Sequence, residues 1–319
     1  MNTAIVIATI SSFALTAILG PRIIPILIRL KAGQTIRGEG PQTHLKKNGT
    51  PTMGGVIFLL GSMIPSLFFV PKYPKIVPVM ILTLGMAIVG FVDDYIKVVL
   101  KRSLGLRAWQ KMLLQILFSL GFGLYVMLFT DIDLAIKIPF ANGVSINLGW
   151  GALPLMVLVI IATVNGTNFT DGLDGLASSV TLVVAVFFVA ASVMIGAGVE
   201  PFAAAFGAGL AGFILYNAYP AQVFMGDTGS LALGGFVAGM AYMLQMPFII
   251  VIIGAIYVIE VMSVILQVSY FKLTHGKRIF KMSPIHHHFE LCGWSETRIV
   301  AVFTIITALM CIISLMGVW

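Results

Sequence analysis

Long apolar runs separated by short polar loops fill the sequence from end to end. A run of about 20 apolar residues is long enough to cross a hydrocarbon core roughly 30 Å thick as a helix. Ten runs approach this length: 3–20 (with a continuation past Pro21 and Pro25), 53–70, 76–92, 112–129, 152–165, 176–196, 201–218, 229–245, 247–270 and 299–317. No polar interval leaves room for a separate soluble domain. The pattern predicts one all-α polytopic membrane domain, residues 1–319, with about ten transmembrane helices.

The first run resembles a signal peptide only in its hydrophobicity. It has no Lys or Arg ahead of it and no clear small-residue cleavage site before a polar segment. We therefore expect a retained helix.

Basic residues are concentrated in three of the loops between the runs. Sixteen of the nineteen Lys and Arg residues fall in the loops after runs one, three and nine, and the other three are Lys72, Lys75 and Lys137. With ten runs, the three basic loops lie on one side of the membrane. Positive loops stay in the cytoplasm, so we expect both termini to be extracytoplasmic.

The interval 132–150 is the long one on the opposite side. It contains two alternating segments around Asn142-Gly143. An Asn-Gly pair between alternating residues is typical of a tight hairpin. We expect a small β-hairpin in this outer loop.

Overall composition agrees with a membrane protein. The chain is 59% hydrophobic and 10% charged, against about a quarter charged in soluble domains. The net charge of +7 would suit nucleic-acid binding, but the basic residues flank the membrane runs and indicate topology instead. The two cysteines, 292 and 311, form neither a disulfide framework nor a zinc motif.

Polar residues that could take part in catalysis or binding gather in the loops that are expected on the cytoplasmic side. We expect an active-site cleft formed by loops of about 31–52, 93–111, 165–175, 217–228 and 271–297. A helical bundle brings such loops to one surface, although no single motif contains the whole set.

Asp93 and Asp94 stand side by side where the third run ends. Two carboxylates near a helix C-terminus repel each other and oppose the helix dipole, and a cation or a proton relieves both effects. Neighbouring helical residues point about 100° apart, so one carboxylate is free to ligate a metal while the other handles a proton. The alternative is a solvated, charged helix end.

Two further segments carry carboxylates. In "NFTDGLDGLA", Asn168, Asp171 and Asp174 recur every third residue and would share one face of a helical turn. In "FMGDTGS", Asp227 precedes a glycine-rich run, where backbone N–H groups would receive a phosphate beside a metal. Helix N-capping is the alternative for both segments.

Histidine and glutamate supply the remaining candidates. His286, His287 and His288 are adjacent, so they would not converge on one ion, and Mg²⁺ prefers oxygen ligands. We interpret them as hydrogen-bond donors to phosphate or sugar, or as a base. Glu260 lies within the ninth run, where it would line a cavity or stabilise a helix break. "GAGLAG" at 207–212 lies inside a run and favours close helix packing over nucleotide binding.

Five segments together closely resemble one family: "HLKKNGTPTMGG" (44–55), "GFVDDYIK" (90–97), "NFTDGLDGLA" (168–177), "FMGDTGS" (224–230) and "PIHHHFE" (284–290). This family is that of the phospho-N-acetylmuramoyl-pentapeptide transferases, which belong to the superfamily of polyprenyl-phosphate hexose-1-phosphate transferases. The resemblance runs in order from about residue 20 to the last helix. The uninterrupted histidine triplet resembles the one in the muramoyl-pentapeptide branch of this superfamily.

The resemblance implies an activity and its partners. Phospho-MurNAc-pentapeptide would move from UDP-MurNAc-pentapeptide to undecaprenyl phosphate, giving lipid I and UMP with Mg²⁺, in the first membrane step of peptidoglycan synthesis. It also implies a ten-helix fold, a homodimer, a multi-pass location in the bacterial plasma membrane and an active site facing the cytoplasm.

The resemblance also assigns residue roles. Asp227 matches the Mg²⁺ ligand, Asp93 and Asp94 match a catalytic pair, and His286 to His288 match the loop over the sugar-phosphate side. Whether Asp93 assists the lipid phosphate or attacks as a nucleophile stays open, as does the choice between Lys46 and Lys47. The substrate-binding matches are Lys46, Lys47, Thr52, Lys111, Asn168, Asp171, Asp174, Asn217 and Phe224.

Two other functions fit part of the pattern. A UDP-N-acetylglucosamine-1-phosphate polyprenyl-phosphate transferase shares the superfamily chemistry. A transporter would suit many helices, Glu260 and glycine-broken segments, but it predicts inverted repeats and charges at membrane depth. The carboxylates instead lie at the ends of the runs.

Overall fold

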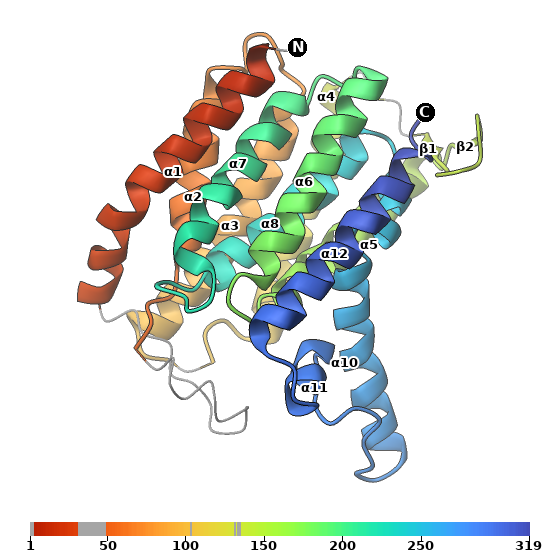
Figure 1. Cartoon of the computed structure of the whole chain (residues 1–319). Coiled ribbons are helices and arrows are strands. Elements are labelled where there is room, and N and C mark those ends of the chain that lie inside the picture. The colour runs from red at the N-terminus through yellow and green to blue at the C-terminus, as the bar shows by residue number, and fades with distance from the viewer. Residues whose placement is uncertain (1–2, 31–48, 103, 131, 133–134) are drawn as a thin grey trace.

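The computed structural model describes residues 3–30, 49–102, 104–130, 132 and 135–319. Most of these residues are helical (Figure 1). The long helices run alternately up and down the bundle, and their bounds are α1 Thr3–Arg29, α2 Gly55–Leu67, α3 Ile76–Val98, α4 Ala108–Phe129, α5 Ala152–Thr170, α6 Leu176–Ile195, α7 Glu200–Asn217, α8 Gly226–Met243, α10 Ala255–Leu273 and α12 Glu296–Leu315. Shorter elements are η2 Gly149–Gly151, η3 Pro247–Ile249, α9 Ile250–Ile253 and α11 Ile285–Leu291.

Membrane-spanning character is evident from length and apolarity. Seven helices of the described residues, counting Gly149–Thr170 as one, are long and apolar enough to cross a bilayer. They include α1, which passes through Pro21 and Pro25 without ending. The chain is therefore a multi-pass membrane protein, while the number of crossings stays a prediction.

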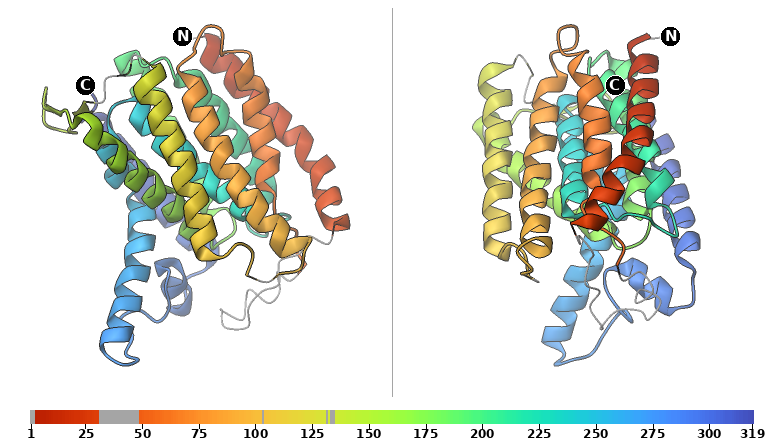
Figure 2. Two further views of the ribbon diagram at one scale, coloured as in Figure 1. Left: turned by 180° about the vertical axis from the view of Figure 1, so that it is seen from behind. Right: turned by 90° about the vertical axis from the view of Figure 1, so that its left-hand side faces the viewer.

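Two helices differ from the apolar runs that predicted them. The third run ends near residue 92, but α3 continues to Val98, so Asp93 and Asp94 lie inside the helix. The ninth run does not form one helix, because the chain breaks at Gly254 between α9 and α10. Helix α10 then extends, with α11 beside it, beyond the ends of the other helices (Figures 1 and 2).

A small two-stranded antiparallel sheet lies within the interval in which a hairpin was expected. Strand β1 (Ile136–Lys137) pairs with β2 (Ser145–Ile146). Lys137 donates its backbone N–H to Gln245 after α8 and its ammonium to the backbone oxygen of Trp319. The sheet, the start of α1 and the C-terminus thus share one end of the bundle (Figure 1).

Helix α8 is the centre of the packing, with every residue from Thr228 to Met243 buried. Glycines allow its neighbours to approach closely, as small residues do between membrane helices. A Cβ on Gly90 of α3 would overlap the Asp227 carbonyl, and one on Gly234 would overlap Val164 of α5. A Cβ on Gly55 of α2 would meet Gly229. Three helices therefore touch the α8 backbone directly.

The segment 207–212 has the packing role that was expected for it. It lies within α7, where a Cβ on Gly212 would press on Thr16 of α1 and one on Gly209 on the carbonyl of Phe58 in α2. The glycine pattern serves helix contact.

The outer helices expose large apolar side chains, whereas those of the central helix are buried. Ile7, Ile10 and Ile18 of α1 and Leu117 of α4 are all more than half exposed. In water such a surface would be unfavourable, whereas hydrocarbon accommodates it. The exposed faces of the bundle therefore face lipid.

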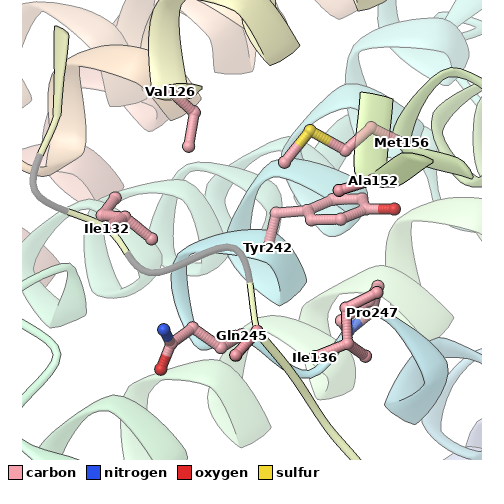
Figure 3. Close-up of a pocket in the computed structure, with 9 residues that line it drawn as sticks. Val126, Ile132, Ile136, Ala152, Met156, Tyr242, Gln245 and Pro247 are labelled. Atoms are coloured by element: carbon pink, nitrogen blue, oxygen red, sulfur yellow. The ribbon is translucent and has the colours of Figure 1, made fainter. Parts of the chain in front are cut away.

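A small apolar cavity lies at the hairpin end (Figure 3). Val126, Met156 and Tyr242 border it, and the Tyr242 hydroxyl has no hydrogen-bond partner among the described residues. Tyr242 is fifteen residues along α8 from Asp227, about 22 Å at the rise of an α-helix. The cavity is thus remote from the charged residues.

Candidate functional site

The charged residues meet at the end of the bundle from which α10 and α11 project. The last turns of α3, the end of α5 and the first turn of α8 lie there, together with the segment leading into α4 (Figure 1). This arrangement joins residues from four of the expected loop regions; the fifth, 31–52, is described only from residue 49 onward.

Asp227, in the first turn of α8, is the point at which the charges converge. Its Oδ2 accepts hydrogen bonds from Lys111 Nζ at 2.8 Å and from Lys97 Nζ at 2.9 Å. Its Oδ1 accepts a hydrogen bond from Asn168 Nδ2 at 2.9 Å. Asn168 also donates to Ser230 Oγ, one turn further along α8. Helices α3, α4 and α5 each contribute a donor to one carboxylate.

Asp93 is buried beside this cluster. Lys97, one turn further along α3, lies 2.6 Å from its Oδ2, and the backbone N–H of Leu106 donates to its Oδ1 at 2.6 Å. Gly105 has φ +59°, and a Cβ there would overlap Asp93 Oδ1, so this close turn favours glycine. The segment between α3 and α4 therefore folds onto the carboxylate.

Asp94 points in a different direction from Asp93. Its Oδ2 accepts hydrogen bonds from the backbone N–H and the hydroxyl of Thr228, at 2.8 and 2.7 Å, and its Oδ1 accepts from the N–H of Asp227 at 3.2 Å. These are the unpaired N–H groups of the first turn of α8, which an acidic cap stabilises. The contacts of Asp94 join α3 to α8.

Asp171 and Asp174 do not share a helical face with Asn168, contrary to the expectation. Helix α5 ends at Thr170 because the glycine-containing segment 171–175 turns instead. Burial, together with the charges of Asp227, Asp94 and Asp174, raises the pKa of Asp171 well above its usual value. Asp174 accepts the backbone N–H of Ala221. Asp171 thus borders the cluster, while Asp174 holds the loop before α8.

The segments 51–55 and 223–226 lie side by side next to the cluster. Phe224 donates its N–H to Pro51 and accepts the N–H of Gly54. A Cβ on Gly226 would lie 2.7 Å from Thr52 Oγ1 and 2.6 Å from Asp94 Oδ2. Thr52 and Phe224 are therefore near the predicted metal ligand.

Two other predictions on this side have different outcomes. Asn217 binds the Val223 carbonyl and accepts a hydrogen bond from Ser178, so its contacts support the loop from within. Lys46 and Lys47 lie outside the described residues.

The three histidines lie on α11 and point to different partners. His286 is 1% exposed, with Nδ1 3.1 Å from Glu260 Oε1 of α10, and its ring presses on Gly172. His287 contacts Glu290 at 2.7 Å. His288 accepts the N–H of Lys281 and lies near Cys292. They do not converge, as expected from their adjacency, and His286 contacts the 171–175 turn at Gly172.

The arrangement suits a magnesium ion held jointly with a substrate. Asp93 and Asp227 contact Lys97 and Lys111, and the carboxyl oxygens of Asp94 and Asp171 lie beside this group. Across the described ranges, no three His, Cys, Asp or Glu side chains form a ready-made metal cage. Mg²⁺ typically takes one or two carboxylates and completes its shell with phosphates and water, which fits this donor set.

Some residues of the cluster were not identified from the sequence. Lys97 was assigned only to a topological loop, although its position four residues after Asp93 is an ion-pair spacing on a helix. Ser230 ends the quoted segment 224–230 but was not singled out, and the Glu260–His286 contact had no sequence signal because it depends on how two helices meet.

Two family sequence models and several relatives match this chain. The sequence model of glycosyl transferase family 4 matches residues 76–245, and signature 1 of the phospho-N-acetylmuramoyl-pentapeptide-transferases matches residues 47–59. The chain is 51% identical, over 95% of its length and 92% of the relative's, to the phospho-N-acetylmuramoyl-pentapeptide-transferase of Acetivibrio thermocellus. It is 50% identical to that of Clostridium botulinum strain Alaska E43, over 98% of this chain and 96% of the relative. For Clostridioides difficile strain 630 the identity is 47%, over 99% of this chain and 98% of the relative.

Proposed function

Because the chain belongs to the phospho-N-acetylmuramoyl-pentapeptide-transferase family, we propose that it transfers phospho-MurNAc-pentapeptide from UDP-MurNAc-pentapeptide to undecaprenyl phosphate, releasing UMP and forming lipid I. The observation that carries the proposal is the carboxylate–lysine cluster around Asp227, at one end of a lipid-facing bundle. The acceptor's tail stays in lipid, so the reaction needs polar groups at the end of the membrane helices.

The main obstacle to this reaction is repulsion between two anions. Attack of one phosphate on another brings negative charges together, and fixed cations reduce that cost most effectively in a poorly hydrated site. Lys111 is 19% exposed and Lys97 is 37% exposed, so both are accessible from the solvent side. In the proposed reaction they neutralise the diphosphate and the departing UMP.

Asp93 is the carboxylate proposed to act on the acceptor. It is held by Lys97 and the N–H of Leu106, which fixes its orientation. A phosphomonoester with a second pKa of about 6 is mostly dianionic at neutral pH, which favours direct attack by the lipid phosphate over a covalent phosphoryl-Asp93 intermediate. Asp93 then orients the lipid phosphate or accepts its residual proton.

Asp227 is the proposed ligand of Mg²⁺, with Asp171 and the substrate diphosphate beside it. When bound, the ion would polarise the phosphoryl oxygens and offset the charge on the leaving group. Asn168 and Ser230 hold the Asp227 side of the site in place.

We further propose ten crossings of the bacterial plasma membrane, with this site on the cytoplasmic side and both termini outside. Successive long helices reverse direction (Figures 1 and 2). Lys97, Lys111 and Lys272 lie near helix ends at the charged end of the bundle, whereas Lys137 lies in the hairpin at the other end. The positive-inside rule supports this orientation. The family resemblance suggests a homodimer.

The activity is tested with purified protein in detergent containing undecaprenyl phosphate. UMP release is measured with UDP-MurNAc-pentapeptide and, separately, with UDP-N-acetylglucosamine. We expect Mg²⁺-dependent release with the first donor only. Release with the second donor alone would assign the chain to the N-acetylglucosamine branch, and substrate translocation without UMP release would indicate a transporter.

The orientation is tested by cysteine labelling in intact cells. Cys292 is exposed, so Asn142→Cys and Lys277→Cys are made in a Cys292→Ser background. A membrane-impermeant maleimide should label position 142 and not position 277. The opposite pattern would place the charged cluster outside the cell and contradict the proposal.

A further inference from the structure

Glu260 and His286 form a buried contact that the proposed reaction does not use. Glu260 is fully buried on α10, His286 is 1% exposed on α11, and 3.1 Å separates Glu260 Oε1 from His286 Nδ1. Within the described part of the chain, neither side chain has a hydrogen-bond partner. Each side chain is therefore a close polar neighbour of the other, and the His287 ring also lies beside His286, with 4.1 Å between the ring centroids.

Burying such a pair costs folding free energy. A buried carboxylate loses its hydration, and one cationic or N–H partner repays that loss only in part. His287 offers a comparison on the same helix: it lies 2.7 Å from Glu290, and 15% of its side chain is exposed. The Glu260–His286 contact is the one buried in the angle between α10 and α11.

The other side of the His286 ring leads to the site. A Cβ on Gly172 would overlap His286 Nε2 and Cε1, so the ring lies flush against the backbone of the 171–175 turn. That turn carries Asp171, whose charge interacts with Asp227 and Asp94. The order in space is Glu260, His286, the turn, and then the carboxylate cluster.

We propose that Glu260 is a positioning residue: through His286 it fixes the 171–175 turn, and so the place of Asp171 at the nucleotide-diphosphate site. A carboxylate beside Nδ1 sets the orientation of an imidazole ring, as in carboxylate–histidine pairs behind metal ligands. Glu260 touches no reacting atom. This inference rests on the proposed function for the identity of the ligand, but not for the contact itself.

A positioning role predicts a particular pattern of losses. Removing the charge of Glu260 frees the ring and lets the turn move, so binding of the nucleotide substrate should weaken. Loss of such outer partners typically costs about 10–100-fold in the affinity of the site they support. The KM for undecaprenyl phosphate should change little, because the acceptor is not bound by this turn.

The test uses Glu260→Gln, which is close to isosteric. Calorimetry with UMP and with UDP-MurNAc-pentapeptide should show about tenfold weaker binding. Glu200→Gln is the matched control, because Glu200 is also a buried carboxylate, bonded to Ser192 at the far end of α7. Its nucleotide affinity should equal that of the wild type.

A double-variant cycle separates positioning from stability alone. In a His286→Gln background, Glu260→Gln should add no further loss of nucleotide affinity, and Gly172→Ala should reproduce the loss from the other side of the ring. Multiplicative losses, or a Glu260→Gln protein with wild-type affinity, would overturn the proposal.

Two readouts keep this result distinct from the activity itself. Thermal midpoints of the wild type, Glu260→Gln, His286→Gln and the double variant test the contact without any ligand. Coupling between the two substitutions supports the contact, and additivity contradicts it. Wild-type protein without transferase activity would refute the proposed function, while the thermal cycle would still decide the contact.

Discussion

Charged groups are buried in two neighbouring places, and the two places are built differently. Around Asp227, three helices supply a lysine or an amide to one carboxylate, and Lys97 and Asp227 are 37% and 17% exposed. Between α10 and α11, one carboxylate meets one imidazole, and both are almost completely closed to solvent. The 171–175 turn lies between the two places.

The difference suits the Asp227 cluster to the reaction and the Glu260–His286 pair to structural support. A cluster with several cations and an opening can exchange partners with an incoming phosphate, because each lysine has a long flexible stem. A closed pair has no room for exchange and can only hold its neighbours. Substitutions in the two places should therefore fail in different ways.

The largest effect is expected for Asp227→Asn. An amide keeps the shape but removes the anionic hard ligand and the partner of both lysines, so turnover should fall by about a thousandfold or more. The measurement is UMP release across a Mg²⁺ titration. Wild-type turnover at limiting Mg²⁺ would show that the ligand assignment is wrong.

Asp93→Asn should lower kcat by about a hundredfold while nucleotide affinity is kept. The reason is that Asp93 contacts Lys97 and the Leu106 N–H, whereas Asn168 donates to Asp227 and Ser230. Calorimetry with UMP, combined with single-turnover UMP release, checks this split. A release of about one UMP per site by wild-type protein without acceptor would instead indicate an Asp93 nucleophile.

Gly90→Ala tests whether the cluster depends on the backbone contact of α3 with α8. The added methyl would overlap the carbonyl of Asp227, so the helices must separate, at a cost of about 1–3 kcal/mol in unfolding free energy. Gly121→Ala in α4 is the control, because no atom lies within 4 Å of its added Cβ. Thermal unfolding in detergent should distinguish them, and equal midpoints would contradict the packing argument.

The smallest effect is expected for His287→Gln. His287 pairs with Glu290 one turn further along the same helix, and such pairs contribute about 0.5 kcal/mol or less. Turnover and nucleotide affinity should stay within roughly twofold of the wild type. A loss as large as that of His286→Gln would mean that the triplet acts as a unit and would remove the distinction between the two places.

The sequence indicated the helices better than their junctions. Apolar runs predicted α6 and α7 to within one residue and α12 to within three, because lipid-facing and buried helices are both apolar throughout. The place of the break at Gly254 was not predicted: a helix break in the run from 247 to 270 was considered only for Glu260, which lies six residues further along, inside α10. A break made by packing leaves no mark in composition.

The site shows the same division. The motifs brought Asp93, Asp94, Lys111, Asn168 and Asp227 into one cluster, as predicted from shared loop parity. The direction of each side chain was not readable: Asp94 faces the α8 N-terminus, and Asp174 and Asn217 support loops. Those directions depend on helix rotation, which only the packed bundle fixes.

The glycine contacts around α8 also limit how this protein can diverge. Gly55, Gly90 and Gly234 bring neighbouring backbones against α8, and there is no space for a larger side chain to be absorbed. Substitutions that persist among relatives should therefore accumulate on the lipid-facing sides of α1 and α4, where one apolar residue replaces another at little cost. We expect the interior helix to tolerate the fewest substitutions and the outer helices to vary with the composition of the surrounding membrane.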